Sequence, residues 1–178
     1  MSAPKKLLIQ ACCGPCAIAA LERFAGDYDI TLFFWGSNLD NAEEFRRRSE
    51  ALNIVNKELN GGRYLAEVPY SHEEFLTAVA GLENEREGGR RCEVCFGLRM
   101  RAAARYAKGN GYDAFTTSLT VSPHKSGTVI NRIGREIGAE VCIPFIAVDL
   151  SENDGFRRSV AVGKRLGIYR QNYCGCKF

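Results

Sequence analysis

Cysteine is the residue type in this sequence best suited to chemistry, because a thiolate can act both as a nucleophile and as a metal ligand. The 178-residue chain has eight cysteines, although its 46% hydrophobic residues can build a core without disulfide staples. Seven of them form three groups: Cys12, Cys13 and Cys16; Cys92 and Cys95; Cys174 and Cys176. The first apolar run lacks the layout of a signal peptide, so we expect a cytoplasmic protein with reduced thiols. The clustering then indicates metal binding or redox chemistry.

The first two groups match several kinds of thiol site. A Cys-x-x-Cys pair occurs in zinc sites, iron–sulfur sites and thioredoxin-like redox sites, so the spacing alone leaves all three open. The adjacent pair Cys12–Cys13 favours an iron–sulfur cluster, because a cluster offers several metal corners to neighbouring thiolates. The four expected ligands are Cys12, Cys13, Cys92 and Cys95. Cys16 is then left as a candidate ligand of a second metal ion.

The other cysteines differ in their surroundings. The tight pair Cys174 and Cys176 would form a strained, easily reduced disulfide, which suits a redox-active relay. Two free thiols in a frayed tail are the alternative. Cys142 stands alone in an apolar segment, and we expect it to be an ordinary buried residue.

The first cysteine group must lie where a strand meets a helix. Residues 6–10 form an apolar run, Gly14–Pro15 forces a turn, and an Ala- and Leu-rich segment follows up to Gly26. The sulfurs then lie near a helix N-terminus, whose dipole favours the thiolate. Further strands are expected at residues 29–35, 63–68, 113–118 and 141–148. The alternation of strands and helices predicts an α/β fold with a doubly wound, mostly parallel, five-stranded sheet.

In such a sheet, functional residues gather beyond the carboxyl ends of the strands. The residues expected at this rim are Cys12, Cys13, Asn38, Thr116, Thr117 and Asp149. The chain reads as a single domain, residues 1–178, with a helical insertion at about 71–111 that carries Cys92 and Cys95. Residues 168–178 form a polar, cysteine-bearing tail.

The charged residues give a weaker signal. The net charge of +3 excludes no class of partner, but arginines cluster at positions 46–48, 90–91, 99–101, 132–135 and 157–158. These clusters fit either a rim that binds a polyanion or ordinary solvated helix faces. No run of about 18 apolar residues is present, so we expect no membrane segment.

Six motifs in this order give the chain a family resemblance. They are ACCGPC, SNLDNAEEFRRR, RCEVCFGLRM, FTTSLTVSPHKSG, DGFRRS and YRQNYCGC, and together they span nearly the whole sequence. In these motifs the chain resembles the QueH family of epoxyqueuosine reductases. The resemblance implies a Rossmann-like sheet of the adenine-nucleotide-hydrolase-like type. It also implies a 4Fe-4S cluster on Cys12, Cys13, Cys92 and Cys95.

The resemblance implies a substrate and a reaction as well. Cys16 falls where members carry a further ligand, which implies an additional iron or zinc ion beside the cluster. The substrate would be a tRNA with a GUN anticodon whose wobble position, position 34, carries epoxyqueuosine. Loss of the epoxide oxygen as water takes two electrons and two protons and yields queuosine. The electron donor is not identified by the sequence.

Candidate roles for other residues follow from this reaction. An epoxide oxygen leaves only when it is polarised, so a Lewis acid and a proton donor are needed. The candidate proton donors are His124, Glu44 and Asp149. The expected substrate and tRNA contacts are Asn38, Arg48, Arg99, Arg157, Arg158, Tyr169 and Arg170, with Trp35, Tyr169 and Tyr173 as stacking platforms. A loop hydrogen bond for His124, core packing for the aromatic residues and a helix-face salt bridge for Arg99 are the alternatives.

Two other functions remain open from the sequence. An ATP-dependent tRNA-modifying enzyme of the PP-loop kind would have the same type of sheet. It needs a phosphate-binding loop after the first strand, where Pro15 lacks an amide donor and thiols occupy the place. A zinc-stabilised RNA-binding module is the non-enzymatic alternative.

Overall fold

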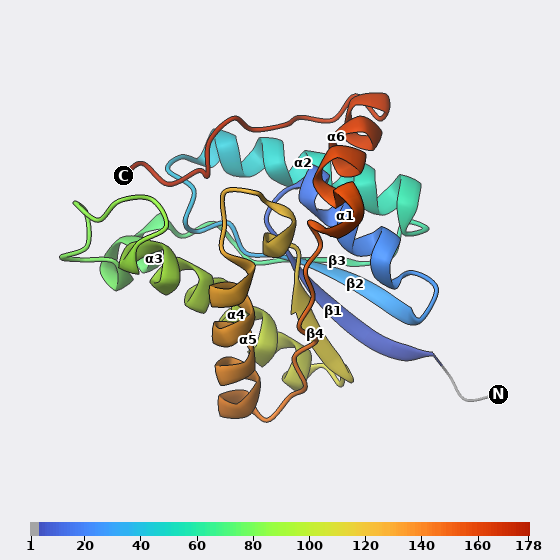
Figure 1. Cartoon of the computed structure of the whole chain (residues 1–178), viewed down its shortest axis with the longest axis horizontal. Coiled ribbons are helices and arrows are strands. Elements are labelled where there is room, and N and C mark those ends of the chain that lie inside the picture. Colours follow the sequence, from blue (N-terminus) through green and yellow to red (C-terminus); the bar gives the residue numbers. More distant parts are fainter. Residues whose placement is uncertain (1–3) are drawn as a thin grey trace.

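A computed structural model describes residues 4–178, which form one parallel sheet with helices on both faces (Figure 1). The strands are β1 (Lys5–Ala11), β2 (Tyr28–Phe34), β3 (Leu65–Glu67) and β4 (Ala114–Thr117). Their order across the four-stranded sheet is β3-β2-β1-β4, and every pair is parallel. The expected α/β fold with a parallel sheet is confirmed. The finer assignment to the adenine-nucleotide-hydrolase-like type stays a prediction.

β1 is a central strand because both of its faces are covered. Its residues Leu7, Leu8 and Ile9 are fully buried, as expected for an apolar strand between two helix layers. The chain runs from β1 outward through β2 to β3 and then returns to the other side of β1 to form β4. At such a reversal a crevice opens beyond the carboxyl ends of the two strands on either side of it, here β1 and β4. Cys12 directly follows β1 and Ser118 directly follows β4, so both lie at this crevice.

The expected fifth strand, residues 141–148, is wrong. The preceding helix, α5 (Gly127–Val141), ends at Cys142, whose φ of 56° turns the chain. The segment then lies beside β4, where Phe145 makes an isolated bridge to Phe115. Pro144 accepts a hydrogen bond from the Phe115 amide at 3.0 Å but has no amide hydrogen of its own. A regular ladder therefore does not develop, although the segment occupies the place of an edge strand.

The other helices divide between the two faces of the sheet. They are α1 (Gly14–Phe24), α2 (Ala42–Leu59), α3 (His72–Ala78), α4 (Arg90–Gly109) and α6 (Gly155–Arg165), with short 3-10 turns η1 (Leu119–Val121) and η2 (Glu152–Asp154). α1, α2 and α6 pack together over one face, and α3, α4 and α5 cover the other (Figure 1). Each layer has its own apolar core, and the sheet separates the two.

The segment expected as a helical insertion, residues 71–111, contains α3 and α4. α4 contacts β1 and β4 and buries Met100, Ala103 and Ala107, so it forms part of the helix layer on that face. Ser71 is the N-cap of α3, although its side chain makes no capping hydrogen bond. None of the helices in residues 4–178 is long and apolar enough to cross a membrane.

Candidate metal and redox site

The first cysteine group occupies the junction between β1 and α1. Cys13 is the N-cap of α1, and its Sγ accepts a hydrogen bond from the Cys16 backbone amide at 3.4 Å. α1 begins at Gly14 rather than after Cys16, so Cys16 lies in the first helical turn. Pro15 fits this turn because the first amides of a helix have no partner within the helix. Local backbone geometry therefore brings the cysteines of this group onto one side of the turn.

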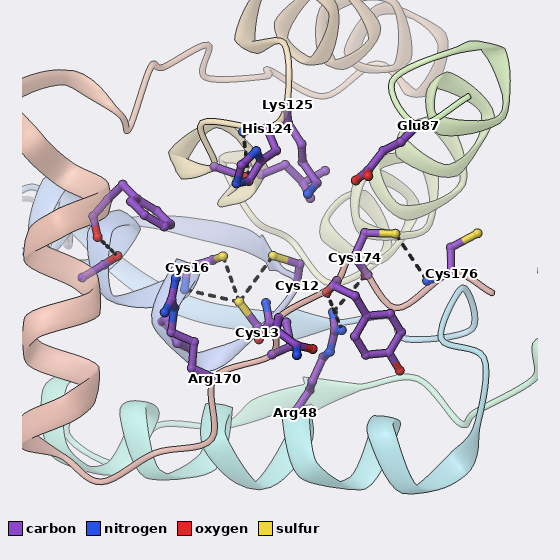
Figure 2. A pocket seen from close by; sticks show the side chains of 18 of the residues that line it. Cys12, Cys13, Cys16, Arg48, Glu87, His124, Lys125, Arg170, Cys174 and Cys176 are labelled. Atoms are coloured by element: carbon purple, nitrogen blue, oxygen red, sulfur yellow. Dashed lines mark hydrogen bonds between the residues drawn. The ribbon is translucent and has the colours of Figure 1, made fainter. Parts of the chain in front are cut away.

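The sulfur atoms of Cys12, Cys13 and Cys16 point toward one another (Figure 2). The Sγ–Sγ distance is 3.7 Å between Cys12 and Cys13 and 2.8 Å between Cys13 and Cys16. All three sulfurs lie within 4.8 Å of one another, which is compatible with binding one metal ion. Ser118, at the end of β4, donates a hydrogen bond from its hydroxyl to Cys12 Sγ at 3.8 Å. We call Cys12, Cys13 and Cys16 the cysteine triad.

The triad shares its negative charge unevenly. Hydrogen bonds from Cys13 and Cys16 hold the pKa of Cys12 well below its usual value, and the positive charges of Arg99 and Lys125 act in the same direction. Burial raises the pKa of Cys13 to about 12. The thiolate of Cys12 and the hydrogen bond to Cys13 raise the pKa of Cys16. One thiolate is thus favoured, and a bound cation is what would make further deprotonation favourable.

The second cysteine group faces an adjoining cavity. Cys92 lies in the first turn of α4 and Cys95 one turn later, as expected from the sequence. Both line a cavity of about 240 Å³ together with the apolar side chains of Phe75, Phe96 and Val129. Burial raises the pKa of Cys95. Within the described residues, the triad is the group whose sulfurs lie close enough to share one ion, and Cys92 and Cys95 are not part of it.

A larger cavity of about 440 Å³ lies over the triad and is also lined by Cys174 and Cys176 (Figure 2). The two cavities share the lining residues Glu87, Arg99, His124, Lys125, Cys174 and Cys176. Lys125 and Glu87 point into the space across from the triad (Figure 2). The cavity therefore combines thiols with charged groups that can pair with an anion or move a proton.

Arg99 lies at the centre of these thiols rather than on the surface. Its side chain is 4% exposed, and its Nε has no hydrogen-bond partner within the described residues. Burial alone would lower the pKa of Arg99, but the negative charges of Cys95, Cys12 and Cys174 raise it. No ion pair joins it to a carboxylate within the described residues, so the alternative of a salt bridge on the helix face does not hold. Its position suits neutralisation of buried negative charge, and it is too enclosed to reach the phosphates of a polynucleotide.

The third cysteine group lies in the C-terminal tail. Cys174 and Cys176 are free thiols, and both line the two cavities. The Cys176 backbone amide donates a hydrogen bond to Cys174 Sγ at 3.4 Å. The hydrogen bond from the Cys176 side chain lowers the pKa of Cys174 to about 5, assisted by this amide and by Arg99. The same pairing raises the pKa of Cys176. The tail therefore presents a thiolate to the cavities and is not frayed.

Glu44 and Arg48 form a buried ion pair that contacts this tail. Arg48 Nε donates to Glu44 Oε1 at 2.6 Å, and the two side chains are 2% and 5% exposed. Glu44 does not line either cavity, although it was a candidate proton donor. Arg48 lines the larger cavity, but its guanidinium is occupied by Glu44 and by the carbonyls of Tyr173 and Cys174. Tyr169 donates its hydroxyl to Glu44 Oε2 at 2.7 Å, and the Arg47 guanidinium lies over its ring.

The other candidate proton donors and the loop amide differ in their access to the cavities. His124 is exposed and lines both cavities. Asp149 lines neither cavity, and its carboxylate accepts hydrogen bonds from the amide and hydroxyl of Ser151. Asn38 is 1% exposed and lines the smaller cavity, where its Nδ2 has no partner within the described residues. His124 and Asn38 therefore remain at the site, and Asp149 does not.

The expected tRNA contacts on the surface are only partly available. Arg157 and Arg158 are exposed on α6, but Arg158 pairs with Glu22 at 3.4 Å. Arg170 is exposed at the larger cavity and lies over the ring of Phe156. Trp35 is 2% exposed and packs in the core under α3 and α4, so it cannot act as a stacking platform. Tyr173 remains available, at 39% exposure.

Cys142 is exposed, contrary to the expectation of a buried residue. Its left-handed backbone ends α5 and directs the side chain away from the apolar core. Sequence reasoning also missed Lys125, Glu87 and Gln171, which line the larger cavity. Only Lys125 gave a signal, since it directly follows His124 in the loop after β4.

Comparison with known protein families bears directly on this geometry. The family model described as epoxyqueuosine reductase QueH matches residues 7–178, which include all three cysteine groups. The chain belongs to the QueH family. The resemblance seen in the sequence motifs is thereby confirmed, and the QueH family is one of oxidoreductases.

Several QueH proteins are similar to this chain over nearly all its length. A protein of Streptococcus pyogenes named epoxyqueuosine reductase QueH is 36% identical over 176 residues, which cover 97% of this chain and 69% of the relative. The proteins of that name from Staphylococcus aureus and Thermotoga maritima are each 32% identical and cover 97% of this chain. These matches cover 75% and 88% of the two relatives. Membership of this family favours a reductase over a PP-loop enzyme or a zinc-stabilised binding module.

Proposed function

We propose that this protein is an epoxyqueuosine reductase that acts on the wobble nucleoside, position 34, of tRNAs with GUN anticodons. The reaction removes the epoxide oxygen as water, consumes two electrons and two protons, and yields queuosine. The observation that carries the proposal is the family match across a chain whose cysteine groups converge on connected cavities. The cytoplasmic location and an electron donor outside the chain complete the proposal.

The donor set fits an iron–sulfur cluster with an adjacent iron or zinc ion. Thiolates are the ligands that such clusters use, and the chain offers Cys12, Cys13, Cys92 and Cys95 around joined cavities. Cys16 is the remaining member of the triad and would hold the adjacent ion. When bound, these groups supply electron transfer and Lewis acidity. Buried Arg99 would balance the negative charge of the thiolates around it.

Protons for the departing oxygen must come from the cavity wall. Among the residues that line both cavities, His124 and Lys125 are those whose side-chain nitrogen can give up a proton. Lys125 points into the cavity across from the triad (Figure 2). We therefore assign the proton transfer to one of these adjacent residues. The Glu44 carboxylate is occupied by hydrogen bonds to Arg48 and Tyr169, and Asp149 lies outside the cavities. Neither residue is placed to donate this proton.

The two cysteines of the tail can supply the electrons that the reaction consumes. Oxidation of the Cys174 and Cys176 thiols to a disulfide releases two electrons and two protons, which equals what the epoxide consumes. The unidentified donor would then return the disulfide to two thiols. Both thiols line the cavities, where Cys174 has a lowered pKa. A redox-active role for this pair is consistent with that position.

Recognition of the tRNA must leave the anticodon base splayed into the cavity. Arg170 at the cavity and Arg157 on α6 are exposed cations that can meet phosphates. Tyr173, exposed beside the cavity, is the aromatic surface available for a base. The unpartnered Nδ2 of Asn38 can donate to the substrate within the smaller cavity.

The decisive experiment uses protein purified without oxygen. The protein is incubated with tRNA that contains epoxyqueuosine and with a chemical reductant, and the nucleosides are analysed by mass spectrometry. We expect a nucleoside that has lost the mass of one oxygen atom. A colourless zinc protein that leaves the epoxide intact would overturn the proposal.

A second experiment identifies the proton donor. Lys125→Gln and His124→Gln are assayed over a range of pH, and the variant that lacks the donor should lose one limb of the pH–rate profile.

A further inference from the structure

The tail that carries Cys174 and Cys176 is attached to α2 by a buried ion pair. We propose that Glu44 and Arg48 are positioning residues, which hold the turn at Gly175 so that the thiol of Cys174 faces the junction of the two cavities. The inference rests on the proposed function for the use of that thiol, but not for the geometry. It replaces the direct role in catalysis or substrate contact that the sequence suggested for the pair.

Arg48 contacts the two residues that precede Gly175 in the turn. Its Nη1 donates to the Cys174 carbonyl at 3.1 Å and its Nη2 to the Tyr173 carbonyl at 3.3 Å. Its guanidinium also lies over the Tyr173 ring, 5.7 Å from the centroid. Glu44 fixes the guanidinium from the other side through its 2.6 Å hydrogen bond. A guanidinium can make all these contacts at once because its donors lie in a rigid plane.

The start of α2 adds a second set of contacts to the tail. The Asp40 amide donates to the Gly175 carbonyl at 2.8 Å, and the Tyr173 hydroxyl donates to Asp40 Oδ1 at 2.9 Å. On the other side of the ion pair, the Tyr169 hydroxyl donates to Glu44 Oε2. The tail is therefore held before and after Cys174. Its path from α6 past α2 is visible in Figure 1.

Gly175 allows the turn to approach this surface. Its φ is 101°, a backbone conformation that residues other than glycine rarely adopt. A Cβ at this position would lie 2.3 Å from the Leu39 side chain and 2.9 Å from Arg48 Nη2. The close approach of the turn to Arg48 thus depends on glycine, which makes Gly175 an independent way to disturb the same attachment.

The attachment of the turn can be detected through the pKa of Cys174. Cys176 lowers the pKa of Cys174 to about 5, and Arg99 lowers it further, whereas Glu87 raises it. Cys95, His124 and Lys125 also line the cavity that Cys174 faces. A tail released from α2 would take the thiol away from Arg99 and loosen the turn. Its pKa would then return toward the ordinary cysteine value of about 8.5.

The test measures the rate at which iodoacetamide alkylates Cys174 as a function of pH. The full chain is purified without oxygen, and tandem mass spectrometry separates Cys174 from Cys176 in their shared peptide. For the unmodified protein we expect a midpoint near the pKa of about 5. Arg48→Met, which removes the donors, should raise the midpoint toward the ordinary cysteine value. Arg48→Lys keeps the charge but not the planar fork and should give an intermediate midpoint.

The matched control is Arg46→Met on the same helix. Arg46 contacts Glu43 and Glu50 and does not touch the tail, so its midpoint should stay unchanged. Gly175→Ala keeps the Glu44 and Arg48 side chains but pushes the turn away from Leu39 and Arg48, so it should also raise the midpoint. This variant is decisive where Arg48→Met fails to fold. A wild-type midpoint in a folded Arg48→Met or Gly175→Ala variant overturns the inference, whatever the melting temperature. None of these readouts needs tRNA, so failure here is distinct from failure of the proposed reaction.

Discussion

At the scale of single residues, the site is governed by which thiols lose their protons. The triad favours one thiolate at Cys12, whereas burial disfavours a second at Cys13. A divalent cation removes that conflict because it attracts all the sulfurs at once. The tail has a similar asymmetry, with a thiolate at Cys174 beside a protonated Cys176. Each group therefore has a distinct expected response to substitution.

Loss of any triad cysteine should weaken metal binding. Cys12→Ala, Cys13→Ala and Cys16→Ala should each lower the affinity for Zn²⁺ or Fe²⁺ by at least about tenfold, since even indirect partners of a metal site have effects of that size. Competition with a chromophoric chelator measures the affinity. Cys142→Ala is the control, because Cys142 is an exposed cysteine outside the cavities around the triad. Unchanged metal content and affinity in Cys16→Ala would show that Cys16 is not a ligand.

The lowered pKa of Cys174 should appear in the pH dependence of stability. A thiol whose pKa is depressed to about 5 stabilises the folded state fully above the unfolded pKa and loses that contribution as pH falls through 5. Between pH 5 and about 8, the free energy of unfolding should rise with pH by up to about 1.4 kcal/mol per unit, reduced by solvent screening. Urea unfolding of the metal-free protein with reductant measures this slope. Cys174→Ser should have a smaller slope, and equal slopes would contradict the assignment.

At the scale of secondary-structure elements, two contacts hold segments that lack regular secondary structure of their own. α2 holds the tail through Glu44 and Arg48, and α5 supports the segment that replaces a fifth strand. Gly134 of α5 lies directly against the ring of Phe145, where a Cβ would come within 2.3 Å of ring atoms. This contact fixes the segment beside β4 in the absence of a regular ladder.

Gly134→Ala should therefore destabilise the fold by overpacking. We expect a loss of about 1–3 kcal/mol, observed as a lower melting temperature in calorimetry. Gly109→Ala is the control, because a Cβ at Gly109 meets no atom within 4 Å and alanine is the better helix former. That variant should be neutral or more stable by up to about 1 kcal/mol. Equal melting temperatures for the two variants would show that Phe145 does not pack as described.

The sequence predicted the elements well wherever a local signal existed. The strand ending at the cysteines, the helix that carries Cys92, and the turn at Gly14 all follow from apolar runs and glycine or proline positions. The prediction of a fifth strand was wrong because it rested on the apolar pattern of residues 141–148 and ignored Pro144. Proline has no amide hydrogen to donate and so interrupts a ladder. The hydrogen bond from the Ser71 amide to the Ser37 hydroxyl is likewise a contact that no local pattern encodes.

The site was predicted in composition but not in arrangement. Residue types identified all three cysteine groups, and the adjacency of β1 and β4 brought Cys12 and Ser118 together. The roles of Glu44 and Arg48 depend on contacts 125 and 126 residues away, which spacing cannot reveal. Trp35 was misjudged because an aromatic residue after a strand can equally face a helix layer.

At the scale of the whole molecule, the triad spans both helix layers. Cys12 packs against the core beneath α3, α4 and α5, whereas Cys16 packs against the core beneath α1, α2 and α6. An ion held by both would link the stability of the two layers. Trp35, the chain's one tryptophan, reports on the first of these cores by its fluorescence.

Metal should therefore stabilise the protein as one unit. Free Zn²⁺ at about 100 times its dissociation constant should add about 2.7 kcal/mol to the free energy of unfolding. Trp35 fluorescence and far-ultraviolet circular dichroism should shift together in denaturant. Cys12→Ala should not respond to the metal. A metal-dependent shift in only one of the two signals would show that the layers are not linked through the triad.

The attachment of the tail to α2 has a consequence for the order of folding. The triad comes from five consecutive positions, whereas Arg48 meets a carbonyl 126 residues later in the chain. Contacts of such sequence separation form late, because a long loop must close first. The cysteine triad at the end of β1 therefore forms before the tail that covers it has docked. During synthesis this leaves an interval in which a metal ion has open access to the triad, and docking of the tail, residues 168–178, ends it.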